Sequence, residues 1–267
     1  MKIYELGEGT PEVAVVGGIH GDEPCGPLAI ERLRAEEPAV ERPVKCIIAN
    51  EEALAAGQRY LDADLNRVFP GDPDAAAHEK RLAHDLAREI QGCTTLALHS
   101  TQSTPRPMGV IRSVDEVARA IYPRLPVDVL IETDAHTEGR LVEYPHTIEV
   151  ECGLQGTDEA AENGYDLVRA FLAATGALPA PEADDRLDIP DSERVDVYRL
   201  RRPIPKPEGQ CYEVLVNNFE RIEEGVAFAA VDDQQLYAET EFYPVLLSPG
   251  GYEDIFGYVA ERVGEVA

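Results

Sequence analysis

The chain has 267 residues, of which 51 are acidic and 24 are basic, so its formal net charge is −27. This length is enough to bury a sizeable core, as one large domain or as a main domain with a smaller one. The negative charge argues against nucleic acid and anionic membranes as partners, because both would repel such a surface. Few of the basic residues are lysine, and this acid-rich, lysine-poor balance favours a high-salt cytoplasm, where ions screen the self-repulsion.

The five cysteines are scattered, and no CxxC pattern occurs. Their odd number speaks against a disulfide framework. The sequence opens on the segment MKIYEL, which predicts a strand, with no signal peptide and no apolar run of membrane length. We therefore expect a cytoplasmic protein.

Apolar runs alternate with helix-like stretches through most of the chain. The runs are short, continuous and β-branched, which is typical of strands covered on both faces, and they predict strands at 12–19, 44–50, 94–100 and 146–153. Helices are predicted at 25–37, 75–92 and 157–176. Thr157 is a suitable N-cap for the last of these helices, and Gly176 a suitable end. Strands that alternate with helices predict an α/β fold with a mixed, largely parallel sheet flanked by helices.

The pattern changes after about residue 178. Residues 179–194 are rich in Pro and Asp and predict a linker. Beyond them, short apolar runs separated by Gly, Pro and Asn predict a small β-rich unit of about eighty residues, within the usual size of a domain. The expected organisation is a catalytic α/β domain at 1–178 and a C-terminal β-rich domain at 179–267.

Metal-binding side chains follow two of the predicted strands. His20 and Glu23 come directly after the strand at 12–19, and His99 lies at the end of the strand at 94–100. In open α/β sheets, sites gather at the carboxyl ends of strands. Either histidine alone is better explained as a turn or core residue. Two imidazoles with a carboxylate, however, make a three-ligand zinc set that leaves a position open for water or substrate.

A second cluster lies in QRYLDADLNRVFPG, residues 58–71. Arg59, Asn66 and Arg67 are suited to a substrate cleft, because arginine binds a carboxylate with two hydrogen bonds. The alternative is that these arginines only pair with the neighbouring Asp62 and Asp64 at the surface.

Three motifs, GGIHGDEPCG, RYLDADLNRVFPG and LHST, resemble the aspartoacylase and succinylglutamate desuccinylase family, of the zinc carboxypeptidase-like superfamily. Their order and spacing match across residues 13–101. The resemblance implies a zinc carboxypeptidase-like sheet and one zinc ion per chain held by His20, Glu23 and His99. It also implies that Arg59, Asn66 and Arg67 bind the carboxylate and carbonyl groups of the substrate and that Thr101 lines the same pocket.

The family also requires a glutamate as general base, and YPHTIEVECGLQG offers two. Glu149 and Glu151 share one face of the predicted strand because they are two residues apart. An E-x-G pattern is similar to the run from Glu151 to Gly153, whereas a gap-free match selects Glu149. We place Glu151 first as the base, with Glu149 as the alternative.

Three further positions are compared with the family. The C-terminal stretch resembles its closing segment, which implies that Tyr252 reaches into the site, although a tyrosine packed on a β-domain is an equal alternative. Arg140 resembles a further substrate-binding arginine. Many relatives carry Asp two residues before the last histidine ligand, where this chain has Ala97. That change removes one carboxylate that would tune His99.

Together these features predict a zinc-dependent amidohydrolase that cleaves the amide bond of a small N-acyl amino acid with a metal-activated water and a glutamate base. A zinc carboxypeptidase acting on short peptides is one alternative. A catalytically silent module that binds an anionic metabolite is another. The sequence leaves the acyl group, the amino acid and the formation of a homo-oligomer open.

Overall fold

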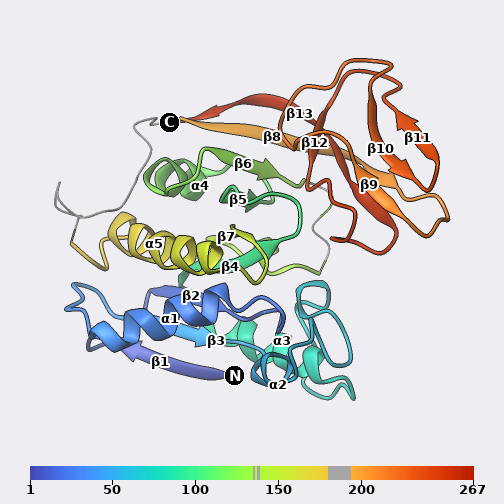
Figure 1. The fold of residues 1–267 in the computed structure, drawn as a ribbon. Coiled ribbons are helices and arrows are strands. Elements are labelled where there is room, and N and C mark those ends of the chain that lie inside the picture. The colour runs from blue at the N-terminus through green and yellow to red at the C-terminus, as the bar shows by residue number, and fades with distance from the viewer. Residues whose placement is uncertain (135, 137–138, 180–193) are drawn as a thin grey trace.

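A ten-stranded sheet extends across the molecule in the computed structural model, which describes residues 1–134, 136, 139–179 and 194–267 (Figure 1). The strand order is β1-β3-β2-β4-β7-β5-β6-β8-β13-β12. The strands are β1 (Lys2–Leu6), β2 (Val13–Gly17), β3 (Val44–Ile48), β4 (Thr94–Thr101), β5 (Met108–Ile111), β6 (Val129–Glu132), β7 (Thr147–Leu154), β8 (Val195–Pro205), β12 (Tyr243–Val245) and β13 (Ile255–Val266).

Strand pairing in this sheet is mixed. The pairs β3–β2, β2–β4, β4–β7, β5–β6 and β6–β8 are parallel, whereas β1, β12 and β13 pair antiparallel and β5 runs against β7. A second, three-stranded antiparallel sheet has the order β11-β10-β9 and is formed by β9 (Tyr212–Val214), β10 (Ala227–Val231) and β11 (Gln234–Tyr237). The predicted mixed, largely parallel sheet with a β-rich C-terminal part is therefore confirmed.

Helices cover the two faces of the large sheet. They are α1 (Cys25–Glu36), α2 (Glu51–Ala56), α3 (His78–Glu89), α4 (Glu116–Ile121) and α5 (Asp158–Ala174). Helices α1 and α5 pack side by side on one face, where their apolar residues meet Leu96 and Leu98 of β4 (Figure 1). Helix α3 packs on the opposite face, against Ala97 and its neighbours. Alternate residues of β4 point to opposite faces, so His99 shares the α3 face with Ala97.

The elements expected from periodicity are present, with ends that differ by a few residues. The Thr157 side chain accepts a hydrogen bond from the Ala160 N–H, and α5 ends just before Gly176, whose φ of +70° suits glycine. Helix α3 begins at His78 instead of residue 75, because Ala77 has an extended backbone with φ of −67° and ψ of 132°.

The C-terminal strands continue the large sheet, because β8 pairs in parallel with β6. Strands from both predicted domains therefore share one sheet, and the division into 1–178 and 179–267 stays a prediction. Of the predicted linker, residues 180–193 lie outside the described residues. No helix within the described ranges is long and apolar enough to cross a membrane.

Candidate active site

The turn after β2 brings His20 and Glu23 together. The backbone N–H of Glu23 donates to the carbonyl of His20 at 3.3 Å, which closes the turn. Gly21 lies against α2, where a Cβ atom would stand only 2.1 Å from the backbone carbon of Ala53, so no larger residue fits. Its N–H donates to the carbonyl of Arg59 at 3.1 Å, which attaches the turn to the loop at 58–64.

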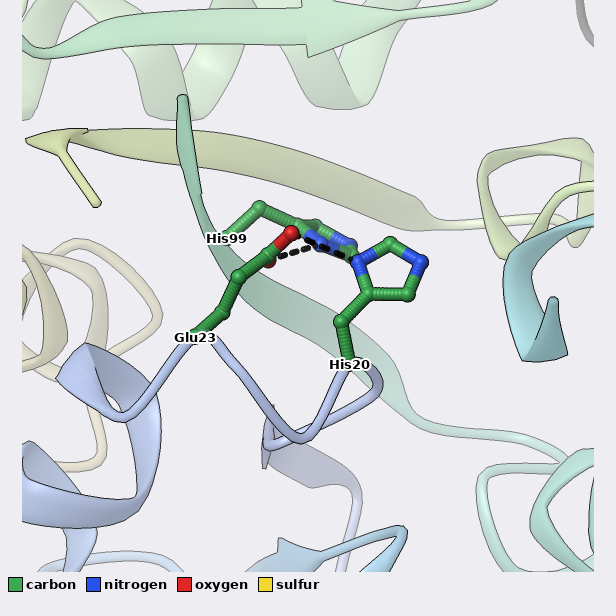
Figure 2. A group of neighbouring side chains, drawn as sticks. All are labelled: His20, Glu23 and His99. Atoms are coloured by element: carbon green, nitrogen blue, oxygen red, sulfur yellow. Dashed lines mark hydrogen bonds and ion pairs between the residues drawn. The ribbon is translucent and has the colours of Figure 1, made fainter. Parts of the chain in front are cut away.

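His20, Glu23 and His99 form a buried cluster at the carboxyl ends of β2 and β4 (Figure 2). One carboxylate oxygen of Glu23 lies 2.8 Å from Nδ1 of His20, and the other lies 3.0 Å from Nδ1 of His99. One donor atom from each residue lies within 4.8 Å of the other two. The three side chains that the sequence singles out are therefore brought together.

The cluster is strongly coupled electrostatically. Burial would raise the pKa of Glu23, but the two imidazoles outweigh burial and hold that pKa well below its ordinary value. Burial alone would lower the pKa of His99, yet the Glu23 carboxylate raises it to about 9. The two imidazoles thus stabilise the ionised form of the Glu23 carboxylate.

A divalent cation fits this donor set. Two imidazole nitrogens and one carboxylate oxygen are the ligands of many catalytic zinc sites. Nε2 of His99 is buried and has no hydrogen-bond partner among the described residues. A buried nitrogen without a hydrogen-bond partner costs folding free energy unless a ligand satisfies it.

A further carboxylate, Asp64, supports the cluster and was not among the predicted site residues. Its Oδ1 lies 3.0 Å from Nε2 of His20, and its Oδ2 accepts from Nε of Arg59 at 3.1 Å. Arg59 also donates to Glu23 at 3.1 Å. The surface pairing considered for Arg59 and Asp64 therefore exists, but it is part of the site.

Asn66 and Arg67 lie in the 3₁₀ turn Leu65–Arg67. Arg67 borders the same cavity as Arg140. The side-chain amide of Asn66 donates to Glu149 at 3.3 Å, and its oxygen accepts from the N–H of Leu141 at 2.8 Å. Burial, and then the charge of Arg140, lower the pKa of Arg67. Neither arginine has a carboxylate within ion-pair distance in the described part of the chain. Two neighbouring guanidinium groups of this kind are suited to an anionic ligand.

The two glutamates of β7 differ in environment. In the parallel register with β4, Glu149 lies beside Ala97 and Glu151 beside His99. Oε1 of Glu149 lies 3.8 Å from Nε2 of His99, whereas Oε2 of Glu151 is buried and, among the described residues, has no hydrogen-bond partner. Burial, together with the charges of Glu23 and Glu149, raises the pKa of Glu151 to about 7.

All predicted site residues border one cavity of about 80 Å³. Tyr252, from the loop between β12 and β13, packs edge-on against Tyr258, and burial raises its pKa to about 12. Thr101 lies at the end of β4 and bonds to Ser103. The cavity is lined by His20, Glu23, Arg59, Asn66, Arg67, His99, Ser100, Thr101, Gln102, Ser103, Val110, Arg140, Glu149, Glu151, Gln155, Leu246, Ser248, Gly251 and Tyr252.

Comparison with known proteins gives one consistent result. Residues 9–123 match the family model of the succinylglutamate desuccinylase/aspartoacylase catalytic domain. The chain is 39% identical to the N-alpha-acetyl-L-2,4-diaminobutyric acid deacetylase of Halomonas elongata, over an alignment that covers 99% of this chain and 86% of that protein. It is 34% identical to a probable aspartoacylase of Prochlorococcus marinus, where the alignment spans only 53% of each chain.

Solved structures share the fold. The ectoine utilization protein of Ruegeria pomeroyi, determined with product bound, superposes with a TM-score of 0.76 at 18% identity, over 99% of this chain and 88% of that one. Murine aminoacylase 3 gives a TM-score of 0.71 at 22% identity, over 97% of this chain and 98% of that one.

Proposed function

Because the chain belongs to the succinylglutamate desuccinylase/aspartoacylase family of amide hydrolases, we propose that it is a zinc-dependent enzyme that cleaves the amide bond of an N-acyl amino acid. One observation carries this proposal. The buried cluster of His20, Glu23 and His99 borders the same small cavity as Glu151, Arg67 and Arg140. One carboxylate oxygen of Glu151 has no hydrogen-bond partner among the described residues.

His20, Glu23 and His99 would hold the metal, which when bound polarises the amide carbonyl and lowers the pKa of water. We assign Glu151 as the general base. It accepts the proton of the attacking water as the water oxygen bonds to the carbonyl carbon. It returns that proton to the nitrogen as the carbon–nitrogen bond breaks, which releases a carboxylic acid and an amino acid.

Glu151 is favoured over Glu149 by their contacts. The Glu149 carboxylate already accepts from Asn66 and lies near His99, which suits a supporting role. The Glu151 carboxylate keeps an unpartnered oxygen within the described residues and has a raised pKa of about 7, and a general base works best near the operating pH.

The arginines divide between two tasks. Arg67 and Arg140 bind the substrate carboxylate, with Tyr252 beside them. Arg59 is already engaged by Glu23 and Asp64, so it supplies positive charge for the tetrahedral oxyanion.

The small cavity, of about 80 Å³, favours a substrate whose reacting part is short. The similarity to a deacetylase named for an N-acetylated diamino acid makes N-acetyl amino acids the first substrates to test. We further propose that the enzyme works in a high-salt cytoplasm, on account of its net charge of −27.

The test is metal analysis and amine release on protein purified in molar potassium chloride. About one zinc per chain, with amine released from N-acetyl or N-succinyl amino acids by the native chain but not by Glu151→Gln, is the expected result. Zinc binding without turnover of any N-acyl amino acid would favour the binding module instead. A chain that takes up no zinc would overturn the hydrolase proposal.

A further inference from the structure

Glu79 is a buried carboxylate that takes no part in the chemistry proposed above. It lies in the first turn of α3 and its relative exposure is 0%. Its Oε1 accepts from the N–H of Leu61 at 2.7 Å and from the side-chain amide of Asn50 at 3.2 Å. Its Oε2 accepts from the N–H groups of Asp62 at 3.0 Å and Ala63 at 3.1 Å. Successive backbone N–H groups arranged in this way form a binding concavity for an anion.

Helix α3 and the loop at 58–64 each provide a carboxylate that accepts backbone hydrogen bonds from the other. The Asp62 carboxylate accepts from the backbone N–H of His78 at 2.7 Å, at the start of α3. We call these contacts of Glu79 and Asp62 the loop clasp. Burial alone would raise the pKa of Glu79, but the four hydrogen bonds outweigh burial and hold that pKa below its ordinary value. The clasp therefore contains an ionised carboxylate at neutral pH.

The clasped residues lie between two side chains of the candidate active site. Arg59 precedes them and donates to Glu23, while its carbonyl accepts from the N–H of Gly21. Asp64 follows them and contacts His20 at 3.0 Å. The loop thus reaches two of the three proposed metal ligands, and Glu79 fixes the backbone between the two points of contact.

We propose that Glu79 is a positioning residue for the metal site, acting chiefly through Asp64. This inference rests on the proposed function for the identity of the ligands. Glutamine is the critical substitution, since it keeps the size of the side chain. Whichever way its amide is turned, the NH₂ group meets two N–H donors that now have no acceptor.

The first experiment measures zinc affinity by competition with a chelator, on protein whose fold is checked by circular dichroism. Glu79→Gln should weaken zinc binding about tenfold or more, the range seen when partners of metal ligands are removed. Glu89→Gln is the matched control, since Glu89 lies at the other end of α3 and bonds to Lys45 at 2.7 Å. It should bind zinc as the native chain does. Equal affinity in Glu79→Gln and Glu89→Gln would overturn the proposal.

A double-mutant cycle asks whether Glu79 acts through Asp64. If it does, Glu79→Gln combined with Asp64→Asn should bind zinc about as weakly as Asp64→Asn alone. If the two substitutions instead lower zinc affinity by independent factors that multiply, Glu79 does not act through Asp64. Should Glu79→Gln fail to fold, Asp62→Ala opens the exposed half of the clasp and should lower zinc affinity in the same direction. Unchanged affinity in that variant would count against the clasp.

Amide hydrogen exchange supplies a readout that needs no metal. The N–H groups of residues 61–63 should exchange at least tenfold faster in Glu79→Gln than in Glu89→Gln, because they lose their acceptor. Unchanged exchange would refute the clasp. If the native chain takes up no zinc, the proposed function fails, whereas the exchange of these amides still decides whether Glu79 holds the loop.

Discussion

The exchange of Glu151 for glutamine, compared with the same exchange at Glu149, tests the central chemical assignment. Both residues lie on the same face of β7 and border the same cavity, so the two variants are matched in size, charge and position. Only the proposed base should matter for proton transfer. A difference in kcat between the two variants therefore reports on proton transfer rather than on the general effect of replacing a glutamate in the cavity.

The expected magnitudes follow from the contacts. Loss of a general acid–base typically costs about 10²–10⁴ in rate. For Glu151→Gln we expect a fall in kcat of about 10³, or about 4 kcal/mol of activation free energy. In Glu149→Gln, the amide oxygen can still accept from Asn66 at the place where the carboxylate does. That variant loses only charge, about 1 kcal/mol, which corresponds to about fivefold in rate.

The assay is amine release from the best N-acyl amino acid, with the zinc content of each variant measured beside it. Both variants should retain zinc, because neither glutamate belongs to the proposed ligand set. If Glu149→Gln loses as much kcat as Glu151→Gln, or more, the assignment of the base is wrong. If Glu151→Gln keeps a tenth of the native rate with zinc bound, Glu151 is not the general base.

The raised pKa of Glu151 also predicts an effect on stability. In the metal-free chain the folded state holds this pKa at about 7, above the ordinary value of 4.5. Ionising the carboxyl therefore costs stability progressively as the pH rises from about 4.5 to 7. Metal-free Glu151→Gln should melt at a higher temperature than the native chain at pH 8, but not at pH 4. An equal difference at both pH values would show that ionisation is not the cause.

Other predictions concern metal, substrate, capping and salt. His20→Ala and His99→Ala should each lose zinc in metal analysis, and retention by either would remove that residue from the ligand set. Arg67→Ala should raise KM tenfold or more with a smaller change in kcat, as a charged hydrogen bond is worth about 1.5–3 kcal/mol. Thr157→Ala should lower the free energy of unfolding in urea by about 1 kcal/mol, through loss of the bond to Ala160. Melting temperature should rise in molar potassium chloride, and no rise would contradict the high-salt interpretation.

The central strands were predictable because local pattern determines them. Buried parallel strands appear as continuous apolar runs, and the runs at 12–19, 94–100 and 146–153 correspond to β2, β4 and β7. A histidine or glutamate at the end of such a run lies at a known edge of the sheet. For this reason His20, Glu23 and His99 could be placed near one another without coordinates, whereas Glu149 and Glu151 were singled out through the resemblance to the family.

Four short elements of the α/β part, β5, β6, α2 and α4, were not predicted. Strands β5 and β6 have four residues each, and α2 and α4 have six each, too few to show a period. The parallel pairing of β8 with β6 joins segments that are distant in the chain, so local sequence does not encode it. Composition instead indicated a boundary between them, because residues 179–194 are rich in Pro and Asp.

The carboxylates that support the site were the least predictable part. Asp62 and Asp64 stand two residues apart in one loop, yet Asp64 contacts His20 while Asp62 contacts the start of α3. That difference depends on the path of the loop, which the distant Glu79 holds. Glu79 itself lies in a charged helical stretch, where nothing in the sequence separates a buried acid from a solvated one.

The distribution of charge indicates how an anionic substrate reaches this acidic protein. The net charge of −27 opposes any anion at long range, whereas Arg59, Arg67 and Arg140 border the cavity itself. At about 1 M salt the Debye length is about 3 Å, so the long-range repulsion is screened while contacts at hydrogen-bond distance persist. In the proposed high-salt setting, capture of the proposed anionic substrate would depend on short-range contacts, and the acidic surface would not interfere with an arginine-lined site.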